Sequence, residues 1–197
     1  MKQLLLFILC ANGFTGKAQD SLLYQIFPLS NTKVIYEKII ETPGQNKDTL
    51  FLKAKVWALS TFKSEKSAFQ TEDRNGGLLA YRTFFTNDFV APSMMGFTNH
   101  LNWDYWSQIR IYIKDNKAKI VIENENVTIT SSATTMTYDL YTFKDYINDG
   151  YKKNKKYGDR YWEASLVNFK EADRKYKALI RSFEVGMNSR RKSEADF

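Results

Sequence analysis

The sequence predicts a two-layer α+β domain, with an antiparallel sheet as one layer and helices on one face of it as the other. The expected element order is β-α-β-β-β-β-α. Two observations carry this prediction. Segments with strand-like alternation of apolar residues are grouped between two segments with helical apolar spacing. Hairpin turn signals, Asn75-Gly76 and Asp115-Asn116, separate the strand-like segments. Strands grouped in this way pair antiparallel, and the flanking helices pack on one side.

The first strand and the first helix follow each other closely. Residues 33–41 are rich in β-branched and aromatic residues and end at Thr42-Pro43-Gly44, which predicts a strand. From Lys47 to Phe62 the apolar side chains recur on one helical face. Asn46 suits the N-cap of this helix, because its side chain can accept a hydrogen bond from a free N–H group there. Asp48 suits the first turn, because its negative charge is favourable near these N–H groups.

Four strands are expected next, as two hairpins. Residues 67–73 and 78–85 flank the Arg74-Asn-Gly-Gly77 turn. In the second hairpin, isoleucines occupy every second position on both sides of Asp115-Asn116. The alternation changes parity near Asn124–Asn126, which predicts a β-bulge.

The last expected element is a long amphipathic helix from about Tyr161 to Val185. We divide the chain into a signal peptide, a leader, one α+β domain and a tail, at residues 1–18, 19–32, 33–186 and 187–197. Within the domain we expect a long loop at 87–107 and an insertion at 137–160.

Residues 1–18 have the layout of a cleavable secretion signal, with Lys2, an apolar run and small residues before the expected cut after Ala18. The apolar run is shorter than a bilayer requires, so a membrane anchor is a weaker alternative, as is lipidation of Cys10. Cleavage would remove Cys10, the one cysteine, and with it disulfide and thiol chemistry. We therefore expect a bacterial protein exported to the periplasm or the extracellular space.

Four features of the chain occur together: the signal, the strand at 33–41, the helix that opens Asp48-Thr-Leu-Phe-Leu-Lys-Ala-Lys-Val-Trp57, and the Arg74–Gly77 turn. In this combination the chain resembles a family of exported bacterial domains of unknown function. The resemblance covers roughly residues 33–130. It implies a fold like one repeat of the TATA-binding protein and a location in the cell envelope. It implies no catalytic residue.

Few catalytic chemistries are compatible with the composition. The chain has one histidine, His100, and lacks phosphate-loop, dinucleotide and calcium-loop motifs, so we expect no metal site and no cofactor. Four carboxylates, Asp88, Asp104, Glu123 and Glu125, leave open an enzyme that acts on a glycan through two carboxylates. A structural component of an envelope assembly is a further alternative. We favour a non-catalytic domain that binds a partner.

The candidate binding residues come from the 87–107 segment and from the sheet face that points away from the helices. Aromatic rings in the segment could contact a sugar, a lipid or a protein, or could close one end of the core. The open sheet face would be covered by the loop, a ligand or a second copy, so a protein partner, an envelope component or a homodimer is expected. The residues are Phe97, Trp103, Tyr105, Trp106, Arg110 and Tyr112.

The positive charge is confined to the last quarter of the chain. The formal charge is +7, yet residues 20–143 contain 13 basic and 13 acidic residues, against 14 and 7 in residues 144–192. This quarter is either a solvated helix face or a contact for an anionic surface. Nucleic acid is not an expected partner, because an exported protein seldom meets it.

Overall fold

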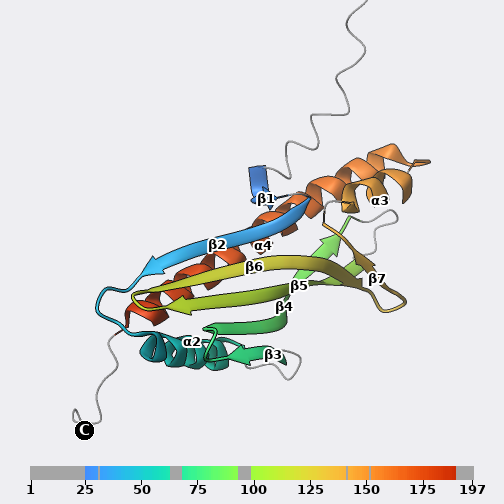
Figure 1. Cartoon of the computed structure of the whole chain (residues 1–197). Coiled ribbons are helices and arrows are strands. Elements are labelled where there is room, and N and C mark those ends of the chain that lie inside the picture. The colour runs from blue at the N-terminus through green and yellow to red at the C-terminus, as the bar shows by residue number, and fades with distance from the viewer. Residues whose placement is uncertain are drawn as a thin grey trace, which may run out of the picture.

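The computed structural model describes residues 25–30, 32–62, 68–92, 99–140, 142–150 and 152–189. A seven-stranded sheet forms one layer, and helices pack on one of its faces (Figure 1). The strands are β1 (Leu29–Ser30), β2 (Lys33–Glu41), β3 (Ala68–Asp73), β4 (Leu78–Ala91), β5 (Asn99–Lys114), β6 (Lys117–Thr130) and β7 (Thr135–Tyr138). The helices are α2 (Lys47–Thr61), α3 (Phe143–Gly150) and α4 (Lys155–Asn188).

All strand pairs are antiparallel, and the sheet order is β1-β2-β6-β5-β4-β3, with β7 also on β6. β2 pairs with the first half of β6, as in Glu37 opposite Val121, and β7 pairs with the second half, as in Thr128 opposite Thr137. The predicted α+β antiparallel fold is therefore confirmed.

Several local predictions are confirmed as well. β2 spans residues 33–41, and α2 begins at Lys47, where the Asn46 side chain accepts a hydrogen bond from the Thr49 amide at 2.9 Å. Both hairpin turns form, at 74–77 and at 115–116. The local sequence determines these features, because capping and turn chemistry involve near neighbours in the chain.

The predicted bulge lies in β6. Trp106 is opposite Asn126 while Ser107 is opposite Asn124, which leaves Glu125 as the extra residue. The Asn124 amide donates to the Trp106 carbonyl at 3.0 Å and to the Tyr176 hydroxyl at 3.0 Å. The bulge is thus anchored to α4, which crosses the sheet at this point.

The long loop predicted at 87–107 is wrong, because this segment consists mainly of two paired strands. β4 runs on to Ala91, β5 begins at Asn99, and residues 87–91 pair with residues 99–103. Apolar residues at alternate positions, such as Phe89 and Leu101, face the core.

The segment 137–160, predicted to be an insertion, is an integral part of the domain. It contains the end of β7, helix α3 and the first turns of α4, which begins at Lys155 and not near Tyr161. Phe143 and Ile147 of α3 are buried, and the Phe143 ring packs on Trp103 with centroids 5.0 Å apart. The segment therefore extends the core beneath β5.

The expected domain boundaries also shift at both ends. Phe27, in the expected leader, is 2% exposed and packs on Phe169 with ring centroids 5.8 Å apart. α4 ends at Asn188, and the buried Met187 belongs to the core. The expected signal peptide at 1–18 lies outside the described residues.

Helices α2 and α4 meet at one end and then separate (Figure 1). The Trp57 indole N–H donates to Ser182 Oγ at 3.0 Å, and the Trp57 and Phe183 ring centroids are 4.9 Å apart. A side chain at Gly186 would crowd this contact, because its Cβ would lie 3.2 Å from Trp57 Cδ1. Beyond the contact, part of the sheet between the helices stays uncovered.

Candidate functional site

Two of the expected binding residues, Trp103 and Tyr105, lie in the core. Both are 0% exposed. The Trp103 ring packs on Phe89 with centroids 4.7 Å apart, and the Tyr105 hydroxyl donates to Asn168 Oδ1 at 2.6 Å. Burial raises the pKa of Tyr105, so its hydroxyl stays protonated. Trp103 therefore belongs to the core, whereas Tyr105 contributes to the floor of the groove described below; Phe97 lies outside the described residues.

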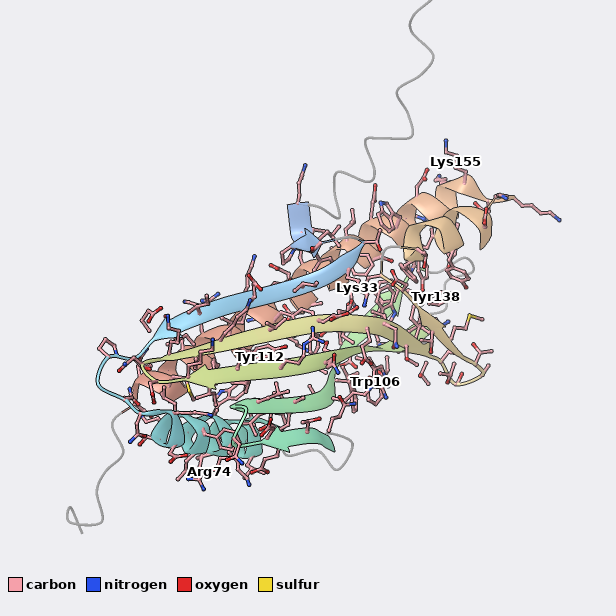
Figure 2. The ribbon with its side chains drawn as sticks, in the orientation of Figure 1. Lys33, Arg74, Trp106, Tyr112, Tyr138 and Lys155 are labelled. Carbon is pink, nitrogen blue, oxygen red and sulfur yellow. The ribbon has the colours of Figure 1, made fainter. Side chains whose placement is uncertain are left out.

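Arg110 belongs to an ion-pair network on the sheet face that points away from the helices, which we call the open face. Its guanidinium donates to Glu123 Oε2 at 2.8 Å and to Gln108 Oε1 at 2.7 Å. Glu123 also pairs with Lys33 from β2. Hydrogen bonds from Lys33 and Arg110 lower the pKa of Glu123 despite its partial burial. The network joins three strands, and Lys33 is labelled in Figure 2.

Trp106 also lies on the open face and is half-buried among its neighbours (Figure 2). Its ring centroid is 4.6 Å from that of Phe84, and the Arg82 guanidinium carbon lies 4.6 Å from the ring centre. Arg82 in turn donates to Glu125 Oε2 at 2.7 Å. A cation therefore already stacks on the Trp106 ring, which reduces the surface left for a ligand.

Tyr112 is the most accessible of those expected binding residues that the structure describes, with 41% of its surface exposed (Figure 2). Ile39, on β2 of the same face, is 57% exposed. Among the described residues, the open face thus combines paired polar groups with exposed apolar side chains such as Ile39 and Tyr112.

A groove of 390 Å³ lies on the helix side of the sheet, where α2 and α4 diverge. We call this site the groove. One wall is the end of α2, the other is α4, and the floor is formed by β4, β5 and β6. Its apolar lining includes Phe62, Phe85, Ile109, Ile122 and Leu179.

The polar groups on the groove floor are already paired with each other. The Tyr176 hydroxyl lies 2.7 Å from Ser107 Oγ and accepts from Asn124 Nδ2 at 3.0 Å. Burial raises the pKa of Tyr176, which keeps the hydroxyl neutral. Ser182, on the α4 wall, accepts from the Trp57 indole. These polar groups line the groove but carry no charge that could pair with a charged ligand.

Lys175 lies at the mouth of the groove. Its ammonium donates to the Thr86 carbonyl at 2.7 Å and lies 5.3 Å from the centre of the Phe85 ring. No carboxylate of the described residues forms an ion pair with it. The nearby acids are engaged elsewhere, since Glu171 binds Arg174 and Asp173 binds Lys177.

A second cavity, of 540 Å³, lies at the start of α2 and is polar. Its charged side chains already have hydrogen-bond partners: Arg74 Nε donates to Asp48 at 3.0 Å, Asp115 accepts from the Lys47 backbone amide at 2.7 Å, and the Lys47 ammonium donates to the Asn75 carbonyl. Because these groups are already paired, the groove is the better candidate site.

The described residues contain no group of three metal-ligating side chains, and none of the groove residues is a carboxylate. Of the four candidate carboxylates, Glu123 and Glu125 are ion-paired and Asp104 accepts from Thr86. His100 is exposed on β5. Among the helices of the described residues, none is long and apolar enough to span a membrane.

The fold and the groove define a class of protein, a single antiparallel sheet with helices on one face that carries a site between two helices. Residues 36–128 match the profile of a family described as a domain of unknown function (DUF4468) with a TBP-like fold. This match agrees with the resemblance stated from the sequence as regards a domain of unknown function with a TATA-binding-protein-like fold.

One solved structure supports this assignment of fold. A DUF4468 family protein from Bacteroides ovatus superposes with a TM-score of 0.56 at 17% identity, over 89% of this chain and 98% of that one. A TBP-like protein from Parabacteroides distasonis gives a TM-score of 0.47 at 14% identity, over 80% of this chain and 96% of that one. A search of curated proteins found no match. The first of these likenesses shows the fold alone.

The sequence predicts one of the groove residues, Tyr105, as a binding residue and does not predict the others. The groove residues come from α2, three strands and α4, and no motif links them. One local signal was present: Lys175 is a cation directly beside the buried Tyr176 on the last helix.

Proposed function

We propose that this protein is an exported, non-catalytic binding domain and that the groove is its binding site. The observation that carries the proposal is an apolar groove of 390 Å³ left open between two helices on an otherwise packed core. Small-molecule sites typically have volumes of about 300–1,000 Å³ and apolar linings. Export is supported by the secretion-signal pattern of residues 1–18 and their small residues before Ala18.

The chemistry of the groove suits a ligand with an apolar body. Phe62, Phe85 and Leu179 are partly buried side chains that pack against the core. When a ligand covers these side chains, the free energy of binding becomes more favourable by about 25 cal/mol per Å² of apolar surface removed from water. The floor hydroxyls of Ser107 and Tyr176 already bond each other, so an apolar ligand would leave neither unpaired.

A carboxylate-dependent glycan enzyme is the less favoured alternative. Such an enzyme needs one carboxyl with a raised pKa as the proton donor. Glu123 has the opposite shift, because Lys33 and Arg110 stabilise its charged form.

The proposal is tested with a neutral apolar fluorophore, N-phenyl-1-naphthylamine, whose emission rises in an apolar site. Ala178 is an exposed α4 residue that lines the groove, so Ala178→Trp places a bulky ring in it. We expect the wild-type protein to bind the probe and Ala178→Trp to lose most of the binding. Val167→Trp, on α4 at a residue 68% exposed and outside the groove lining, is the matched control and is expected to bind normally.

Two results would contradict the proposal. One is a wild-type protein that does not bind the neutral probe at micromolar concentration. The other is undiminished binding by Ala178→Trp, which would locate the probe elsewhere.

A second candidate function is contact with a protein partner or a second copy through the open face. The exposed Ile39 and Tyr112 favour it, since isolated apolar and aromatic residues often anchor an interface. A two-protomer mass by light scattering that falls to one protomer in Tyr112→Asp would support the homodimer. A one-protomer wild-type mass would contradict it.

A further inference from the structure

We infer that the groove binds an anionic amphiphile, with its apolar chain along the groove and its carboxylate at the Lys175 ammonium. This inference rests on the proposed function and adds the chemical class of the ligand. It is built from three features of the groove: its floor, its mouth and the charges around the mouth.

The floor determines which end of a ligand enters first. Ile109 and Ile122 form apolar parts of the floor and are fully buried. The hydroxyls of Ser107 and Tyr176 there are 2.7 Å apart and satisfy each other. A charged group placed on this floor would lose its water and gain no ionic partner, which is costly. The apolar end of the ligand therefore lies deepest.

The mouth provides the partner for the charged end. A lysine ammonium has three N–H donors, and Lys175 uses one on the Thr86 carbonyl at 2.7 Å. The Phe85 ring, 5.3 Å away, holds the ammonium over the apolar wall. Two donors thus remain for a carboxylate, because both oxygens of Glu171 are hydrogen-bonded to Arg174. These hydrogen bonds, and to a smaller extent the charge of Lys175, lower the pKa of Glu171.

The charges around the mouth leave this position attractive to an anion. The helix segment 170–177 contains four basic and two acidic residues. Arg174 binds both carboxylate oxygens of Glu171, at 2.6 and 2.8 Å, and Lys177 binds Asp173 at 2.8 Å. Because both acids are paired, they oppose an incoming carboxylate only weakly.

The same lysine also has a structural effect, which the test must separate from ligand binding. β3 pairs with β4 only as far as Arg82, so among the described residues β4 is a sheet edge from Thr83 to Ala91. Lys175 occupies one carbonyl of that edge, and lysines commonly protect edge strands from pairing with other chains.

The experiment compares decanoate with decanol by competition against N-phenyl-1-naphthylamine, since the two compounds share the chain and differ in charge. We expect the wild-type protein to bind decanoate about tenfold more tightly than decanol, as one charge-assisted contact provides. Lys175→Gln is expected to remove this preference and leave decanol binding unchanged, and Lys175→Arg to retain it. Lys170→Gln, on an exposed α4 residue outside the groove lining, is the matched control and should keep the preference.

The outcomes separate this inference from the proposed function. Equal wild-type binding of decanol and decanoate, or a preference that persists in Lys175→Gln, would overturn the inference while the groove remains a binding site. Displacement of the neutral probe by neither compound would overturn the inference as well. Failure to bind the neutral probe itself would overturn both. A purely edge-protecting lysine would give a Lys175→Gln protein that associates with itself and keeps the wild-type preference.

Discussion

The ammonium of Lys175 lies 5.3 Å from the centre of the Phe85 ring, at the mouth of an apolar groove. The pair joins α4 to β4 at the part of β4 that β3 no longer covers. A cation is thereby held beside apolar surface without a described carboxylate partner. This arrangement distinguishes the groove from the open face, where the cations Lys33, Arg82 and Arg110 are all ion-paired.

Tyr176 connects the groove floor to the bulge in β6. Tyr176→Phe removes the hydroxyl that bonds Ser107 and Asn124, so we expect a loss of about 1–3 kcal/mol in the free energy of unfolding. Urea denaturation measures it. Tyr112→Phe, at an exposed residue, is the control and should change stability by less than about 0.5 kcal/mol. Equal, small effects of both substitutions would show that the buried hydroxyl network contributes little.

The locations of Trp103 and Trp106 predict unequal losses of stability. Trp103→Ala leaves a cavity among Phe89, Phe143 and Phe169, and we expect it to cost about 3–5 kcal/mol. Trp106→Ala, on the open face, loses contacts with Phe84 and Arg82 and should cost about 1 kcal/mol. Thermal and urea unfolding of both variants provide the comparison. A larger loss for Trp106→Ala would contradict the assignment of Trp103 to the core.

The Glu123 network predicts a pH-dependent contribution to stability. Since its pKa is lowered in the folded protein, the contribution is complete above the unfolded value of about 4.3 and disappears as pH falls through the lowered value. We expect Glu123→Gln to reduce stability by about 1–2 kcal/mol at pH 7 and by much less at pH 3. Glu37→Gln, in the exposed pair with Lys119, should have little effect at either pH. A Glu123→Gln effect independent of pH would indicate loss of packing and not of charge.

Gly44 and Gly77 both have a left-handed backbone conformation, and comparing them separates the cost of backbone strain from the cost of steric crowding. Gly77 has φ of +72°, and an added Cβ would lie 2.3 Å from the Ile113 carbonyl oxygen, whereas Gly44 has φ of +78° and free space around it. Gly44→Ala should therefore cost about 1 kcal/mol, from backbone strain alone. Gly77→Ala should cost about 2 kcal/mol or more, because the hairpin must also move away from β5. Equal costs in denaturant titrations would argue against the close contact at Gly77.

Local signals predicted most of the fold. The Asn46 cap, the two hairpin turns and the parity change near Asn124 each depend on neighbouring residues, and all three are present. The segment 87–107 contains alternation that marks a strand, since Leu101, Trp103 and Tyr105 are buried and the residues between them are not. Trp106, on the open face directly after Tyr105, interrupts this pattern in the sequence.

The candidate site could not be predicted in the same way. It exists because α2 and α4 are in contact at Trp57 and Ser182 and then diverge, and this angle depends on packing between segments far apart in the chain. The sequence places Lys175 in the basic last quarter of the chain, which it predicts to be a solvated helix face or a contact for an anionic surface. Its role depends on the neighbouring Phe85 and Thr86, which the sequence does not place beside it.

The most direct test of the central claim, that the ligand binds in the groove, is methyl NMR of the isotope-labelled protein titrated with decanoate. The groove account predicts shift changes that saturate at the methyl groups of Ile109, Ile122 and Leu179, which line the groove. Ile35 and Ile39, on the open face of β2, should keep their shifts. Saturating changes at Ile35 and Ile39 with unchanged groove signals would contradict the account and locate binding on the open face.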